Sequence, residues 1–267
     1  MCIRDRCDFV QFFGGEPTLN MPAMTAFVDE ARGMVRAGTI ASTPHFGIVT
    51  NGASADPNAL VAFCNAYDVS ATVSLDGPQR VHDALRPAAG GRGSFDAALL
   101  TIRALQDAHV PVAIETVYTA AHIDAGCTIV DVFRLAENLG VRKVVLHTVY
   151  PPAPSELLPF DDTHFRQLLD LHIDAARWWF ESLVQARTAP LDVYFRDLLV
   201  PLLQGAGVGV AGGTCPAGDR GLAVGPGGGA HSRHPPHRAP RYPPWPLTPG
   251  RTGGDPAPPP PPPPHFP

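Results

Sequence analysis

Residues 8–19 read DFVQFFGGEPTL, a short apolar run that breaks at two glycines. A run of this length, bounded by turn residues, is typical of a buried β-strand. Asn20 can then cap a helix that has Pro22 in its first turn and continues to about Val35. Because a strand followed directly by a helix is the repeating unit of α/β domains, this stretch predicts that class of fold.

The same alternation continues along the chain. Further strands are predicted at 46–50, 69–75, 110–118 and 143–148, and further helices at 56–67, 129–139, 161–187 and 192–203, with one more that Ser94 caps. The strands are mostly apolar rather than alternating, which favours a parallel sheet covered by helices. An open doubly wound sheet and a closed barrel both satisfy this pattern. In both, the chemistry lies at the carboxyl ends of the strands.

Composition narrows the classes of function. The chain has 267 residues, of which 45% are hydrophobic and 17% charged, and its formal net charge is -5. We therefore expect a globular protein with neither nucleic acid nor membrane as partner. No apolar run approaches the roughly 18 to 20 residues that a transmembrane helix needs. Five scattered cysteines do not form the pattern of a disulfide framework, which favours a reducing, cytoplasmic setting.

Unusual residues gather where the predicted strands end. In chain order these are Gly14-Gly15-Glu16-Pro17, Thr50-Asn51-Gly52, Ser74-Leu75-Asp76-Gly77-Pro78, Val81-His82-Asp83, Arg86 and Gly93-Ser94-Phe95-Asp96. A glycine pair lets a ligand approach the backbone. Glu16 beside it is a carboxylate able to accept hydrogen bonds from an ammonium group. Taken alone, a tight turn with a solvated glutamate would also explain Glu16.

This ordered set of motifs resembles the radical S-adenosylmethionine (SAM) enzymes, in the branch with a C-terminal SPASM domain that includes anaerobic sulfatase-maturating enzymes and peptide maturases. The resemblance covers about residues 8 to 228. It implies a partial parallel (β/α) barrel at 8–150, a helical connector at 151–205 and the start of a SPASM-like iron–sulfur domain at 206–228. It also implies a parent enzyme that cleaves SAM reductively with a 4Fe–4S cluster and modifies a peptide or protein side chain. The electrons would come from a flavodoxin or ferredoxin.

Site residues carry over from the family's motifs. Gly14–Pro17 match the motif that binds the amino group of SAM, and Ser74 matches a strand-end serine near the carboxylate or ribose. Arg86 matches the arginine that pairs with the carboxylate, a task that suits its two parallel donors. Asn51 stands at a strand end that lines the cofactor pocket in the family. A plain turn at Asn51 and a solvated loop charge at Arg86 are the open alternatives.

The cysteines divide into three groups. Cys2 and Cys7 do not match the family's CxxxCxxC cluster motif and lie too near the glycine pair, so we expect the chain as written to be unable to cleave SAM. Cys64 and Cys127 fall on a predicted helix and at a helix start, which predicts buried structural thiols. Cys215 matches the first cysteine of a SPASM domain, which implies a ligand of an auxiliary 4Fe–4S cluster.

Both ends of the chain differ in character from the rest. Residues 1–7 resemble a translated sequencing remnant and are expected to be a non-native leader. Residues 229–267 hold 16 of the 31 prolines, which predicts disorder or polyproline II. A shifted reading frame or a proline-rich ligand for adaptor domains would account for this composition.

Two other classes of function stay open beside the radical enzyme. A βα scaffold that has lost its cluster would bind a peptide or protein without catalysis. An unrelated barrel enzyme would use Glu16 and Asp76 as acid and base. A metal site built on His164 and His172 is not expected, because the two lie eight residues apart on one predicted helix.

Overall fold

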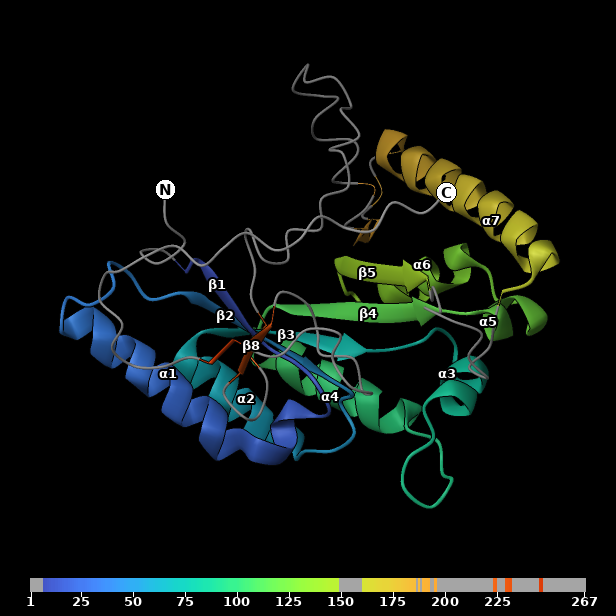
Figure 1. Ribbon diagram of the computed structural model, residues 1–267. Helices are drawn as coiled ribbons and strands as arrows, with labels where there is room; N and C mark the ends of the chain where they lie inside the picture. Colours follow the sequence, from blue (N-terminus) through green and yellow to red (C-terminus); the bar gives the residue numbers. More distant parts are fainter. Residues whose placement is uncertain are drawn as a thin grey trace, which may run out of the picture. The chain divides into compact units, whose positions relative to one another are not determined.

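The computed structural model divides into two compact units, residues 2–209 and, together with Met1, residues 210–267. It describes residues 7–148, 160–185, 187, 189–192 and 195 of the first unit, and residues 223–224, 229–231 and 245–246 of the second. The first unit carries the motifs at the strand ends, and its labelled helices and strands are drawn in Figure 1.

The first unit is built around a parallel sheet (Figure 1). In the part of the chain described, its strands are β1 (Phe9–Phe12), β2 (His45–Thr50), β3 (Val69–Ser74), β4 (Val112–Tyr118), β5 (Lys143–Thr148) and β6 (Leu191–Asp192). They lie in chain order, and every neighbouring pair is parallel. A doubly wound sheet reverses its strand order at a switch point. The unbroken order therefore identifies a partial (β/α) barrel, which confirms the predicted fold class.

Helices connect the strands and cover the sheet. They are the short η2 (Pro17–Asn20) and the α-helices α1 (Met21–Arg36), α2 (Pro57–Tyr67), α3 (Gln79–Leu85), α4 (Phe95–Asp107), α5 (Ala120–Asp124), α6 (Ile129–Asn138) and α7 (Asp162–Val184). Figure 1 shows α1, α2 and α4 along one face of the sheet. The sequence predicts the longer helices but misses α3 and α5, which have 7 and 5 residues, too few to show a helical period.

The cap predicted at Asn20 is formed, and Asp56 caps the helix predicted from 56. The Asn20 side chain accepts a hydrogen bond from the backbone N–H of Ala23 at the start of α1, and the Asp56 side chain accepts from the N–H of Asn58 at the start of α2. Each such cap stabilises its helix by about 1 kcal/mol. These short-range contacts explain why both helix starts could be predicted from sequence.

The predicted cap at Ser94 is wrong in its chemistry. Ser94 stands at the N-cap position of α4, but its side chain makes no capping bond and donates instead to the backbone carbonyl of Arg86. Asp83, twelve residues before the helix start, accepts from the N–H of Phe95 in its place. Because Asp83 comes from the preceding helix, its capping role depends on tertiary structure and no local pattern indicates it.

The core lies between the sheet and its helices. In β3, Val69, Ala71 and Val73 are at most 2% exposed and belong to this core, whereas Ser70 and Thr72 between them are half-buried. Side chains alternate between the two faces of a strand. The polar positions of β3 therefore lie on the face opposite the helices, which is the interior face of a barrel.

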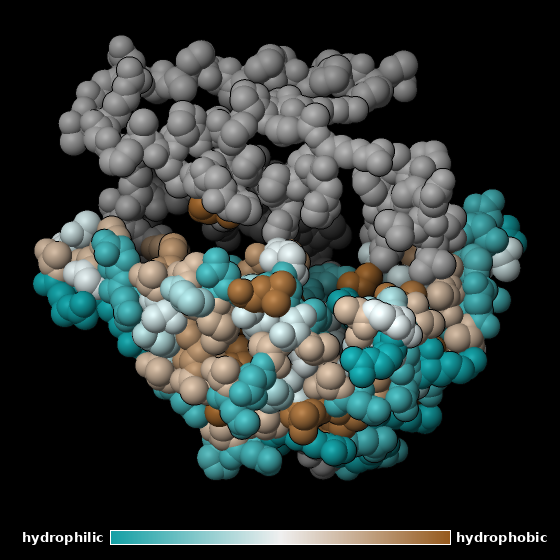
Figure 2. Space-filling model, turned by 90° about the horizontal axis from the view of Figure 1, so that it is seen from below, coloured by the Kyte–Doolittle hydropathy of each residue, from teal (hydrophilic) through white to brown (hydrophobic). Residues whose placement is uncertain are grey.

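The helix side of the unit is an ordinary mixed surface. Figure 2 shows this side with hydrophobic residues scattered among polar ones. Large apolar side chains such as Phe27 on α1 and Leu100 on α4 are half exposed or more. Single exposed apolar residues are common on globular proteins and indicate no binding surface.

The region after α7 departs from its prediction. The long helix expected at 161–187 is present as Asp162–Val184. The helix expected from Asp192 does not begin there, because Asp192 pairs with Val144 of β5 as part of β6. The remainder of the predicted helix, apart from Phe195, lies outside the described residues.

The second unit has a small antiparallel sheet among its described residues. Its strands β7 (Ala223–Val224), β8 (Gly229–His231) and β9 (Trp245–Pro246) lie in that order. Both β8 and β9 fall inside residues 229–267, the segment for which composition predicts disorder. The boundaries of the leader, the connector and the SPASM-like segment stay predictions.

Candidate functional site

The predicted motifs follow strands that share one edge. Parallel pairing places the carboxyl ends of β1, β2, β3 and β4 side by side. Gly14–Pro17 follow β1, Asn51 follows β2, Ser74 ends β3, and Arg86 follows α3. The structure thus brings these residues to the carboxyl edge of the sheet, where ligands of α/β proteins bind. Cys215 lies outside the described residues.

Glu16 joins the loop after β1 to the end of β2. Its Oε1 accepts from the hydroxyl of Thr50 at 2.7 Å, and its Oε2 accepts from the backbone N–H of Asn51 at 2.7 Å. Oε1 also accepts from the backbone N–H and the hydroxyl of Thr18. A carboxylate offers about four acceptor positions. Oε1 is therefore crowded with three donors, while Oε2 with one donor keeps capacity for an ammonium group.

The glycine pair leaves the backbone bare beside this carboxylate. Gly14 has a φ of 94° and Gly15 a φ of 52°, in the left-handed region that favours glycine. A Cβ built at either position would meet no other atom within 4 Å. Glycine is therefore favoured at both positions by the positive φ angles, and not by a lack of space for a side chain. The open space gives a ligand direct access to the main chain.

The side chain of Asn51 is used within its own loop. Its Oδ1 accepts from the backbone N–H groups of Ala53 and Ser54, and its Nδ2 donates to the Ser54 hydroxyl. This is the turn-forming behaviour typical of asparagine. Asn51 contacts Glu16 through its backbone N–H. The hydrogen bonds of its side chain are all explained by the turn.

Arg86 is anchored by a buried carboxylate. Its Nε donates to Oδ2 of Asp76 at 2.5 Å, where the side chain of Asp76 is 4% exposed and that of Arg86 is 30% exposed. The other oxygen of Asp76, Oδ1, accepts from the backbone N–H of Val117 at 2.9 Å. Asp76 is the sole partner of the guanidinium among the described residues, so both terminal Nη groups are left for a ligand.

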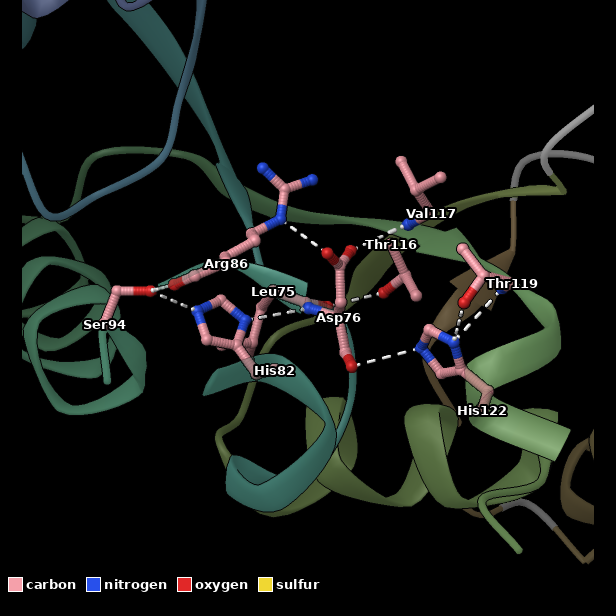
Figure 3. Close-up of polar contacts among 9 residues, drawn as sticks. All are labelled: Leu75, Asp76, His82, Arg86, Ser94, Thr116, Val117, Thr119 and His122. Carbon is pink, nitrogen blue, oxygen red and sulfur yellow. Dashed lines mark hydrogen bonds and ion pairs between the residues drawn. The ribbon is translucent and has the colours of Figure 1, made fainter. Parts of the chain in front are cut away.

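Two buried histidines hold the backbone of Asp76 (Figure 3). The N–H of Asp76 donates to Nδ1 of His82 at 3.1 Å, and its carbonyl oxygen accepts from Nε2 of His122 at 3.2 Å. Burial lowers the pKa of both histidines below the ordinary value, although the negative charge of Asp76 opposes this shift. Both rings are therefore neutral near pH 7.

Sequence reasoning found only part of this site. Asp76 and His82 stand within quoted motifs, but their roles as anchor and clamp were not foreseen. His122 carries no sequence signal, because it lies 46 residues from the carbonyl that it binds. The side chain of Asp76 is 4% exposed, and its two oxygens accept from Arg86 Nε and from the backbone N–H of Val117, so these contacts assign it a holding role.

The described residues do not fit an iron–sulfur cluster. Cys64 and Cys127 are buried, and burial raises the pKa of their thiols to about 12 and about 11. A cluster needs thiolates. In the described ranges no three His, Cys, Asp or Glu side chains gather as a metal site. The prediction of structural thiols is thus supported by the burial of both cysteines.

Comparison with known proteins gives structural matches alone. No protein-family model matches the chain, and no curated protein does. The anaerobic sulfatase-maturating enzyme anSMEcpe, with bound AdoMet and the Kp18Cys peptide, matches with a TM-score of 0.60 and 19% identity, over 74% of this chain and 53% of that one. Native anSMEcpe with bound AdoMet matches with a TM-score of 0.59 and 18% identity, over 74% and 52%. A weaker match, with a TM-score of 0.43 and 14% identity over 64% and 35%, is SuiB from Streptococcus suis bound to S-adenosylmethionine.

The two anSMEcpe matches confirm the predicted resemblance at the level of the fold. The neighbours are radical SAM enzymes. The chain spans about half the length of the anSMEcpe structures that it matches. Within the residues described, no helix has both the length and the apolar character that crossing a membrane requires.

Proposed function

We propose that this chain is part of a radical SAM enzyme of the SPASM branch, and that its carboxyl edge binds SAM. The observation that carries the proposal is the arrangement of Arg86, whose Nε is held by buried Asp76 while its two Nη groups have no partner among the described residues. A guanidinium held in this way offers the pair of donors that a carboxylate accepts.

SAM has an amino-acid end with an ammonium and a carboxylate group, and the site has a complement for each. Oε2 of Glu16 has acceptor capacity for the ammonium group, and the Nη groups of Arg86 donate to the carboxylate. The bare backbone at Gly14 and Gly15 lets the ligand lie close to the chain. Ser74, 6% exposed, ends β3, the strand that pairs with β2.

The proposed reaction belongs to the whole protein. The parent enzyme would cleave SAM reductively with a 4Fe–4S cluster and modify a peptide or protein side chain, in the cytoplasm and with electrons from a flavodoxin or ferredoxin. The AdoMet and peptides bound to anSMEcpe support a SAM site and a peptide substrate. The described residues provide no ligand set for the cluster, so the part assigned to them is confined to binding and orienting SAM.

Calorimetric titration of the chain with SAM tests the proposal. We expect binding, and we expect Arg86→Lys to weaken it about 10-fold to 100-fold, because lysine cannot donate two parallel hydrogen bonds to the carboxylate. The matched control is Arg92→Lys, since Arg92 is exposed in the loop before α4. Its affinity should stay within about twofold of the wild type.

Absence of SAM binding by the wild-type chain would refute the proposal. Equal losses in the Arg86 and Arg92 variants would also refute the assigned role of Arg86, because general charge attraction would then explain the affinity. Unfolding curves of both variants, recorded without SAM, separate a loss of affinity from a loss of folded protein.

A further inference from the structure

Arg86 is held at two points, one on its side chain and one on its backbone. Its Nε donates to Oδ2 of Asp76, and its backbone carbonyl accepts from the hydroxyl of Ser94 at 2.5 Å. Figure 3 shows the guanidinium with Nε toward Asp76 and its other two nitrogens turned away from that carboxylate. An arginine side chain is ordinarily flexible. In Arg86 both the guanidinium and the backbone are restrained before a ligand binds.

The hydrogen bonds set the tautomer of His82. The backbone N–H of Asp76 donates to Nδ1 of His82, so Nδ1 carries no proton and the ring proton lies on Nε2. Nε2 lies 3.0 Å from Oγ of Ser94 and therefore donates to it. Since Ser94 in turn donates to the carbonyl of Arg86, the chain of bonds returns to the arginine that Asp76 anchors.

His122 binds the backbone carbonyl of the same residue, Asp76. Its Nδ1 accepts from the backbone N–H of Thr119 at 3.1 Å, so its proton also lies on Nε2, which donates to the carbonyl of Asp76. The ring is fully buried and stacks on Tyr118 with 4.5 Å between ring centroids. The residue that anchors Arg86 is thus fixed through its N–H, its carbonyl and both side-chain oxygens.

We infer that Asp76 is the positioning residue that aims the Nη groups of Arg86 at a ligand carboxylate, with His82 and His122 holding Asp76 in place. The inference rests on the proposed function, in which this carboxylate is that of the amino-acid end of SAM. Ordering the guanidinium in the folded protein removes an ordering step from binding, which increases affinity for the carboxylate specifically. The ordered guanidinium does not increase the affinity for the other groups of the ligand.

Decarboxylated SAM provides the discriminating probe, since it keeps the adenosine, sulfonium and amine groups but lacks the carboxylate. We expect the wild-type chain to bind SAM about 10-fold to 100-fold more tightly than decarboxylated SAM, the range for charge-assisted hydrogen bonds. Asp76→Asn removes the negative charge that pairs with Arg86 and leaves one acceptor where two N–H donors point, which weakens the anchor on Arg86. The ratio of the two affinities should then fall to about threefold or less.

The ratio of the affinities for SAM and decarboxylated SAM distinguishes a positioning role of Asp76 from a purely structural one. A merely structural role would lower the affinities for both ligands equally and leave their ratio unchanged. In an Arg86→Lys background, Asp76→Asn should change the ratio no further, because the two residues act in series. Asp170→Asn, on the exposed face of α7, is the matched control and should retain the wild-type ratio.

A second measurement serves if Asp76→Asn does not fold. In the wild-type chain the Arg86 Nε–H should exchange with solvent at least about 10-fold more slowly than that of exposed Arg92, as seen by nuclear magnetic resonance of 15N-labelled protein. Equal exchange rates, or an unchanged ratio in folded Asp76→Asn, overturn the positioning role alone. A wild-type chain that binds SAM and decarboxylated SAM equally overturns the contact between Arg86 and the carboxylate, and one that binds neither overturns the proposed function as well.

Discussion

The carboxylate of Glu16 accepts a 2.7 Å hydrogen bond from the backbone N–H of Asn51, 35 residues further along the chain. Together with the bond from the Thr50 hydroxyl, this contact ties the glycine loop to the end of β2. Glu16 therefore has a structural task beside its proposed contact with the ammonium group of SAM. The same residue that would meet the ligand also fixes the loop that the ligand must approach.

Glu16→Gln should lower the free energy of unfolding by about 1–3 kcal/mol, because the amide has one acceptor where the carboxylate has two and would face a buried donor with its own NH2 group. Urea unfolding curves measure this change. Glu30→Gln, an exposed change on α1, is the control and should stay within about 0.5 kcal/mol of the wild type. Equal effects of the two changes would show that the tie to β2 contributes nothing.

Gly52→Ala should destabilise the protein by about 2–4 kcal/mol. Gly52 has a φ of 69°, and a Cβ there would lie 2.8 Å from Cγ1 of Val73 and 3.2 Å from the backbone of Ala98. Gly90→Ala is a matched control, since Gly90 has a φ of 81° but open space around the added atom. It should cost only the conformational part, about 1–2 kcal/mol. Thermal unfolding of both variants gives the comparison, and equal losses would contradict the close packing at Gly52.

Acid should destabilise the fold through the two clamping histidines. Burial lowers the pKa of His82 and His122, so the unfolded chain binds more protons than the folded one below about pH 6.5. The contribution of these two histidines to the free energy of unfolding should therefore fall as the pH drops from 7 to 5. Unfolding curves of the wild type and of His122→Gln across this range isolate it, because the variant should lose less stability toward pH 5 than the wild type. Equal slopes in the two proteins would contradict the neutral clamp.

A histidine on the interior face of the sheet should change the stability with pH in the opposite direction to His82 and His122. Nε2 of His147 on β5 lies 3.1 Å from Oε1 of Glu115 on β4, and this hydrogen bond raises the pKa of His147. The pair contributes stability below about pH 6.5, and this contribution is lost as the pH rises through the raised pKa. Glu115→Gln should thus cost more stability at pH 6 than at pH 9, by about 0.5 kcal/mol given the partial exposure of His147. A cost that does not change with pH would count against the pair.

Sequence reasoning succeeded where the determining contacts are short. Asn20 and Asp56 reach the third and second residue beyond them, so local patterns predicted their helices. It failed where the contact is made in three dimensions. The hydroxyl of Ser94 turns to Arg86, and His122 reaches Asp76 across 46 residues. The motifs at the strand ends located the candidate site, and the contacts that hold Arg86 within it required the structure.

Nuclear magnetic resonance can locate the SAM site directly, through the shifts of backbone amide signals when SAM is added to the 15N-labelled chain. We expect the shifts to gather at the carboxyl ends of β1, β2 and β3, among Gly14, Gly15, Asn51 and Gly77. Amides at the amino ends of the strands, such as His45 and Lys143, should keep their positions. Shifts that gather at the amino ends, or that leave the glycine pair and Gly77 unmoved, would contradict a SAM site at the carboxyl edge.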